Sequence, residues 1–166
     1  MKALAGVAAI AALLLAACGE GASFPEPVAC ATPVPAASST PRQAVNQYLS
    51  GVRAAVDRLA TLRETLRNEY PGDKFSRDSR FRADFAVYAD STVCGAQNLI
   101  AVRPPSTNLA QFDDNLDGTL QALIDHTQAG RAAVKARNVS DYRTWYQGAD
   151  VKLEAVKAAA SQTGTR

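Results

Sequence analysis

The chain has 166 residues, of which 47% are hydrophobic, 20% are charged and 7% are aromatic, and its formal net charge is +2. This length favours a single domain, because domains most often hold about 100–150 residues. Proteins that bind nucleic acid usually carry a strongly basic surface, so the nearly balanced charge argues against a nucleic-acid partner.

Residues 1–17 have the pattern of a secretory signal peptide. Lys2 supplies a positive start, and residues 3–17 are an unbroken run of Ala, Leu, Val and Ile with one Gly. As a helix this run would be only about 22 Å long, which is shorter than the ~30 Å hydrocarbon core of a bilayer. We therefore expect residues 1–17 to be a targeting segment that is removed, rather than a membrane-spanning helix.

The end of that run carries the most specific motif of the chain. Leu15-Ala16-Ala17-Cys18 resembles the lipobox of bacterial lipoproteins. The resemblance covers residues 1–18 and implies cleavage before Cys18, with acyl chains attached to that cysteine. Each buried methylene contributes roughly 0.8 kcal/mol, so two or three acyl chains would anchor the protein to a membrane outside the cytoplasm. Gly19 stands where Asp resembles an inner-membrane retention signal, which favours the outer membrane in a two-membrane bacterium.

Two further cysteines, Cys30 and Cys94, remain after Cys18 is assigned to lipid. Export would place both in an oxidising compartment, where a pair of cysteines is usually bridged. We predict a Cys30–Cys94 disulfide, with two separate thiols as the alternative. We expect no metal centre, because no further cysteine exists and His126 is the only histidine. We expect no cofactor, because the sequence has no glycine-rich phosphate loop and no haem-attachment motif.

Residues 18–40 are expected to form the lipidated N-terminus and a flexible stalk. The segment is rich in Ala, Pro, Ser, Thr and Gly. It cannot bury enough apolar surface to order itself, and its prolines keep it extended. A Cys30–Cys94 bridge would leave only the part before Cys30 free and would hold the second half of the stalk across the helices.

Residues 41–161 are expected to form four helices. The first has a capping box from Thr40 to Gln43 with Pro41 at its first position, and it ends at Tyr70-Pro71-Gly72. Its apolar residues recur at steps of three and four, which is typical of an amphipathic helix. They are Val45, Tyr48, Val52, Ala55, Leu59, Leu62 and Leu66.

The other three helices have weaker boundaries. We expect the second to begin near Ser76 and run to about Val102, unbroken or interrupted at Gly95. The third would open at Ser106 or Thr107 and end at Asn138, and Ser140 would cap the fourth, which leaves residues 162–166 as a frayed tail. Short connections predict an all-α, up-down-up-down four-helix bundle, with a three-helix bundle plus a separate helix as the alternative.

Asp113, Asn115 and Asp117 are the weak metal candidates, because with Gly118 they match the first half of a calcium loop. The twelfth position of that loop is Ile124, where a bidentate Glu is needed. The apolar stripe of the third helix, which includes Phe112, Leu116 and Leu120, also passes through this segment without losing phase. We therefore favour an unbroken helix, with the two aspartates one turn apart on an exposed face.

The remaining candidates are aromatic side chains and the single histidine. Tyr142, Trp145 and Tyr146 are weak candidates for lining a ligand pocket between helices, although a place in the core is the more ordinary interpretation. His126 lies at the edge of an apolar stripe, and any acid–base catalysis would depend on it. No nucleophile motif surrounds any serine.

These patterns leave three hypotheses for function. The favoured one is a non-enzymatic lipoprotein of the cell envelope, whose bundle presents a face to an envelope protein or a cell-wall partner. The second is a bundle that binds a small ligand or an ion. The third, which the sequence favours least, is an enzyme that uses His126.

Overall fold

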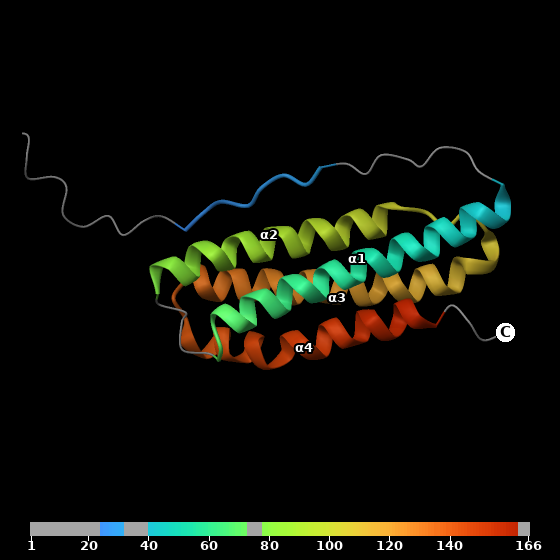
Figure 1. Ribbon diagram of the computed structural model, residues 1–166. Coiled ribbons are helices and arrows are strands. Elements are labelled where there is room, and N and C mark those ends of the chain that lie inside the picture. The colour runs from blue at the N-terminus through green and yellow to red at the C-terminus, as the bar shows by residue number, and fades with distance from the viewer. Residues whose placement is uncertain (1–23, 32–39, 73–77, 163–166) are drawn as a thin grey trace, which may run out of the picture.

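The computed structural model describes residues 24–31, 40–72 and 78–162. These residues form four α-helices, α1 (Pro41–Glu69), α2 (Ser79–Ala101), α3 (Ala110–Lys135) and α4 (Val139–Ser161). Each helix runs antiparallel to the one before it and packs against it, and α1 also packs against α4 (Figure 1). The predicted up-down-up-down four-helix bundle is therefore confirmed. In the described part of the chain, no helix has the length and apolar character needed to cross a bilayer.

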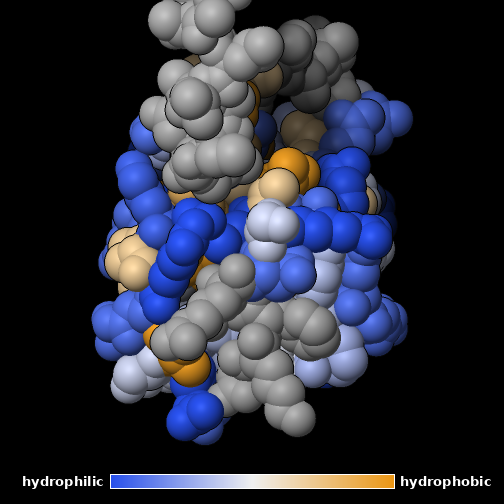
Figure 2. Space-filling view, turned by 90° about the vertical axis from the view of Figure 1, so that its left-hand side faces the viewer, coloured by the Kyte–Doolittle hydropathy of each residue, from blue (hydrophilic) through white to orange (hydrophobic). Residues whose placement is uncertain are grey.

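The bundle has two ends. We call the end at which α3 leads to α4 the proximal end, and the opposite end, at which α1 begins, the distal end. At the proximal end, α1 ends and α2 begins, and α3 leads to α4 through residues 136–138. At the distal end, α2 leads to α3 through residues 101–110, and α1 begins. Figure 2 faces the proximal end, where the described residues in view are mainly hydrophilic and orange is confined to small, separate patches.

The boundaries of α1 follow the sequence. The capping box between Thr40 and Gln43 is present, and Pro41 is the first helical residue. Pro at this position loses no helical hydrogen bond, because the first amides of a helix have no partner within it. The helix ends before Tyr70, and Gly72 then adopts a φ of 94°, which suits a residue without a Cβ atom.

The start of α2 differs from the prediction. Asp78 is the N-cap, and its carboxylate accepts a hydrogen bond of 2.8 Å from the amide of Phe81. Ser76, the predicted cap, lies outside the described residues. The helix continues unbroken through Gly95, where a Cβ atom would lie 3.0 Å from the Leu59 side chain of α1. Gly95 therefore permits close packing of α1 on α2 rather than a break.

The boundaries around α3 also need correction. Ser106 caps a short 3₁₀ turn, η1 (Thr107–Leu109), and α3 begins after it. At the other end α3 stops at Lys135, and the amide of Asn138 bonds back to the carbonyl of Ala133, as in a Schellman motif. The Asn138 side chain then accepts hydrogen bonds from the first amides of α4. Asn138, not Ser140, is thus the cap of α4, because one residue serves both helices.

The core divides into two apolar clusters. The proximal cluster is largely aromatic and includes Phe81, Phe85 and Trp145, whereas the distal cluster is aliphatic and includes Leu59 and Leu120. Between the two clusters along the helices lie buried polar residues of α1, α2 and α3. They are Arg63, Thr92 and Thr127. The predicted apolar stripe of α1 supplies Tyr48, Val52, Leu59 and Leu66 to these clusters, so the periodicity identified the inward face of this helix correctly.

Residues 24–31 correct the prediction of a flexible stalk over residues 18–40. We call them the strap, because they run extended alongside α2 (Figure 1). Phe24 is only 7% exposed, and its ring packs against the bundle. An aromatic ring gains enough from burial to order a short segment that composition alone predicts to be free. The rest of the predicted stalk, residues 18–23 and 32–39, lies outside the described residues, as do residues 163–166 of the predicted tail.

Candidate functional site

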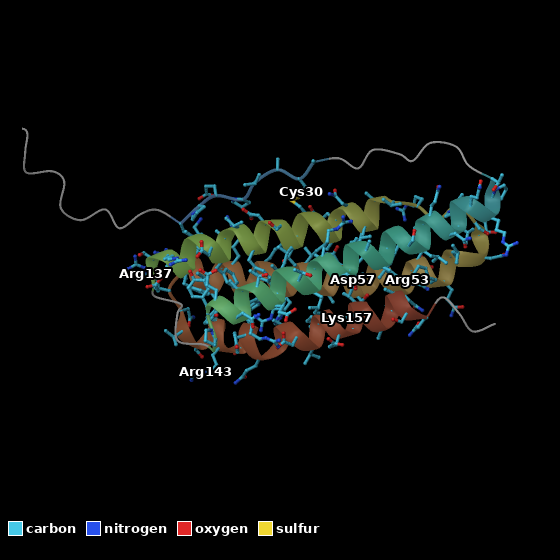
Figure 3. All side chains as sticks on the ribbon, in the orientation of Figure 1. Cys30, Arg53, Asp57, Arg137, Arg143 and Lys157 are labelled. Carbon is cyan, nitrogen blue, oxygen red and sulfur yellow. A yellow bond between two sulfur atoms is a disulfide. The ribbon has the colours of Figure 1, made fainter. Side chains whose placement is uncertain are left out.

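The strap is held to the bundle by a disulfide. The Sγ atoms of Cys30 and Cys94 are 2.01 Å apart, so the predicted pair is bonded. Figure 3 shows the Cys30 sulfur pointing from the strap towards α2. The bond joins positions 64 residues apart in the sequence. Cys18, the predicted lipidation site, lies outside the described residues.

The beginning of the strap is held by charged side chains of α2 and α3. The ring of Phe24 lies near two guanidinium groups, with centroid distances of 5.6 Å to Arg82 and 5.0 Å to Arg131. Arg131 also donates a hydrogen bond to the carbonyl of Pro25, and Lys135 pairs with Glu26 at 3.2 Å. Cations over an aromatic face are attracted by its quadrupole, and partial burial strengthens the attraction. The strap is therefore docked at the proximal end of the bundle.

A cavity of about 300 Å³ lies between the strap and helices α2 and α3. Its polar lining includes the Asp90–Arg131 ion pair, in which the charged atoms are 3.1 Å apart, and the amide groups of Gln97 and Gln128. The two charged side chains are 15% and 12% exposed. The volume is at the low end of the range for small-molecule sites. The cavity is therefore large enough for a small molecule, and its two charged side chains already pair with each other.

A second concavity, which we call the apolar groove, lies between α1 and α2. It measures about 430 Å³, and Leu62, Leu66, Val87 and Tyr88 supply its apolar lining. Its other lining residues are polar or charged: Arg58, Thr61, Thr65, Glu69 and Asp84. Val87 is 65% exposed, although it belongs to a helix whose other large apolar residues are mostly covered. Exposed apolar surface of this kind is typical of sites that receive a partner's side chains.

The weak metal candidates do not form a calcium loop. Gly118 lies inside the unbroken α3, and in the described part of the chain no group of three or more His, Cys, Asp or Glu side chains is placed to hold a metal ion. Asn115 is exposed. The expectation that Asp113 is exposed was wrong, because it is 6% exposed and accepts a hydrogen bond of 2.6 Å from the Tyr48 hydroxyl.

The group around Asp113 is an electrostatic cluster at the distal end. The Arg103 guanidinium lies 3.8 Å from the Asp113 carboxylate and 3.7 Å from that of Asp117. Burial, together with the neighbouring Asp113 charge, raises the pKa of Asp117. Burial and the hydrogen bond to Asp113 raise the pKa of Tyr48. These side chains fasten α1 to α3, which explains them without a ligand.

The aromatic candidates are core residues. Tyr142 and Trp145 are 1% and 2% exposed, and their rings contact Phe85 at centroid distances of 6.0 and 4.7 Å. Tyr146 is only partly buried, and its hydroxyl accepts a hydrogen bond from the amide of Gly72. Because other rings fill the space around Tyr142 and Trp145, these side chains do not line a ligand pocket.

His126 is used in packing. Its Nε2 atom lies 2.9 Å from the carbonyl oxygen of Trp145, so Nε2–H donates to that carbonyl. Its ring stacks on the indole, with an interplanar angle of 22°. A Cβ atom on Gly148 would lie 2.8 Å from the His126 ring, so this glycine makes room for the imidazole. The arrangement positions α3 against α4.

Arg63 is a second buried charge that the sequence analysis missed. It is 3% exposed, and its Nε donates a hydrogen bond of 2.8 Å to Asp150 of α4. Its guanidinium also lies 5.2 Å from the ring centroid of Trp145 and 4.9 Å from that of Tyr146. Position 63 continues the apolar stripe of the helix from Leu59 to Leu66, and a charge in that register was the available signal.

Comparison of the chain with protein-family models, with curated proteins and with solved structures finds no match.

Proposed function

We propose that this protein is a lipid-anchored, extracytoplasmic helical module of the cell envelope, and that it binds a protein partner through the apolar groove between α1 and α2. The groove is the single observation that carries the binding role. It has an apolar floor with charged residues beside it, it is open to solvent, and Val87 projects there with no covering segment among the described residues. Apolar side chains of a protein fit such a groove better than the polar surface of a cell-wall glycan.

The Cys30–Cys94 disulfide supports the extracytoplasmic location. Structural disulfides persist where thiols are oxidised, and cytoplasmic thiols are usually kept reduced. The lipobox-like Leu15-Ala16-Ala17-Cys18 supports export and anchoring on independent grounds, because it concerns a segment that the disulfide does not touch.

The anchor is tested by acyl labelling and membrane fractionation of a Cys18→Ala variant. We expect this variant to lose the label and to leave the membrane fraction. The matched control replaces both Cys30 and Cys94 by serine, which removes two cysteines but leaves Cys18, and it should keep the label. Labelling of the Cys18→Ala variant at the level of the unmodified protein would contradict the lipid assignment.

The binding role is tested by crosslinking in native membranes followed by mass spectrometry. A Val87→Asp substitution places a charge at the groove and should abolish the crosslinked species. Val151→Asp is the matched control, because Val151 is 67% exposed on α4, outside the groove, whereas Val87 is 65% exposed within it. Recovery of only the monomer from unmodified membranes, or equal loss in both variants, would count against the groove as the binding site.

A second candidate function is binding of a small polar ligand in the cavity beneath the strap, which the enclosed Asp90–Arg131 pair favours. A ligand that binds only the native state must raise the melting temperature. A thermal-shift screen against metabolites should then give stabilisation that an Asp90→Asn variant loses. Stabilisation that persists in Asp90→Asn would place the ligand elsewhere.

A further inference from the structure

The strap changes the end of the bundle from which the N-terminal tether leaves. The helices themselves begin at Pro41, which lies at the distal end. The strap, however, starts at the opposite end, where Phe24 and Glu26 contact Arg131 and Lys135 in the last turns of α3. In Figure 1 the blue strap begins above the first turns of α2, whereas α1 begins at the other extremity. A tether therefore leaves from the proximal end while the strap is docked.

The lengths involved make this difference large. Cys18 precedes Phe24 by six residues, and six residues span at most about 20 Å when fully extended. Cys18 precedes Thr40 by 22 residues, and a free segment of that length reaches up to about 75 Å. The bundle itself is roughly 39 Å long, as judged from the 26 residues of α3 at ~1.5 Å each. With the strap docked, the tether is shorter than the bundle.

We propose that the docked strap turns the proximal end of the bundle towards the phospholipid headgroups and points the distal end away from the membrane. This orientation rests on the proposed lipid anchor at Cys18. Arg137 and Arg143 are exposed at the proximal end, where Figure 3 shows both, and so are Asp78 and Asp141, so this end would present charges of both signs to the headgroups. The Tyr48–Asp113–Arg103 cluster would face away from the bilayer.

The same geometry assigns the disulfide a role beyond stability. Phe24 holds the start of the strap by packing and Glu26 by an ion pair, and the disulfide at Cys30 holds its other end against α2. Loss of both the ring contact and the bond would transfer the attachment point to the start of α1, at the distal end. The bundle would then lose its preferred orientation.

Energy transfer from a fluorophore on the protein to an acceptor on lipid headgroups tests this orientation. The acylated full chain, carrying either Ser140→Cys at the proximal end or Asn108→Cys at the distal end, is labelled without reductant. It is reconstituted in vesicles of phosphatidylcholine with a minority of phosphatidylglycerol. Both positions are exposed. Because transfer falls steeply with distance, we expect it to be several-fold greater from Ser140→Cys than from Asn108→Cys.

Two altered chains show whether the strap causes the difference. A Gly-Ser insertion between Ser23 and Phe24 leaves the strap and bundle intact but lengthens the tether, and it should lower transfer from the proximal probe. Replacing Phe24, Cys30 and Cys94 by serine releases the strap and should remove the difference between the probes. Circular dichroism checks that this triple variant stays helical. The insertion variant keeps Phe24 and the disulfide, so the test that it provides does not depend on how the triple variant folds.

The outcomes separate the two proposals. Equal transfer from the two probes in vesicle-bound, acylated protein would overturn the orientation while leaving the anchor in place. Proximal transfer that does not respond to the insertion would overturn the role of the tether. Failure of the purified chain to carry acyl groups and to float with vesicles would overturn the anchor, and the orientation with it.

Discussion

Gly130 and Gly118 lie in the same helix, and the structure predicts opposite effects for replacing them by alanine. A Cβ atom on Gly130 would lie 2.5 Å from Cδ1 of Trp145 and 2.6 Å from Cγ and Nε1. At Gly118, which is exposed, a Cβ atom would meet nothing within 4 Å. The first glycine thus makes room for the indole, whereas the second has no such use.

The magnitudes follow from two opposing effects. Alanine is favoured over glycine inside a helix by roughly 1 kcal/mol, which applies at both positions. Overpacking of a well-filled core costs about 1–3 kcal/mol, and the upper part of that range applies because neighbouring rings hold the indole. We expect Gly130→Ala to lower the free energy of unfolding by about 2 kcal/mol. We expect Gly118→Ala to raise it by up to ~1 kcal/mol.

Urea unfolding monitored by circular dichroism measures both changes. Trp145 is the only tryptophan of the chain, so its fluorescence also reports the displacement of the indole in Gly130→Ala. In a Trp145→Ala background the same glycine substitution should become neutral or stabilising, because the clash is gone. If Gly130→Ala stabilises the unmodified protein as much as Gly118→Ala does, the packing of α4 on α3 described above is wrong.

Three other predictions concern charge and covalent constraint. Asp150→Asn should lower the free energy of unfolding by about 1–2 kcal/mol in urea titrations, because it leaves the buried Arg63 guanidinium without its anion, and no change would contradict that pairing. Burial and then hydrogen bonding raise the pKa of Tyr70 from 10.0 to about 12, so the stability due to the neutral phenol is complete below pH 10 and is lost as the pH rises through 12. A Tyr70→Phe variant should show a smaller decline over that range in melting temperature against pH. Replacing Cys30 and Cys94 by serine should cost roughly 4 kcal/mol in the chain-entropy description of a loop of this size, measured by guanidinium unfolding, and an unchanged midpoint would refute the constraint.

The sequence predicted the bundle because its signals are local. Capping residues such as Thr40 and Gln43 act within one helical turn, and the stripe along α1 depends only on spacing. The disulfide was predictable from the number of cysteines and the expected compartment. None of these inferences needed the positions of the helices relative to one another.

The details that were missed depend on contacts between distant segments. Phe24 stands in a Pro- and Ala-rich stretch, and its ring is buried against the bundle near Arg82 of α2 and Arg131 of α3. Asp113 is buried because Tyr48 of another helix supplies a hydrogen bond. The start of α4 was misplaced because Asn138 closes one helix and caps the next, and both roles fit the same residue type.

The polar layer between the two core clusters also restricts how the helices align along the bundle axis. A shift of α1 by one turn, about 5.4 Å, would carry the Arg63 guanidinium away from Asp150 and into one of the two apolar core clusters. Leucines and alanines alone would tolerate such sliding, because one aliphatic contact replaces another at little loss. Arg63 thus fixes the axial register of α1, because only one of the alignments that the apolar faces would accept keeps its guanidinium paired.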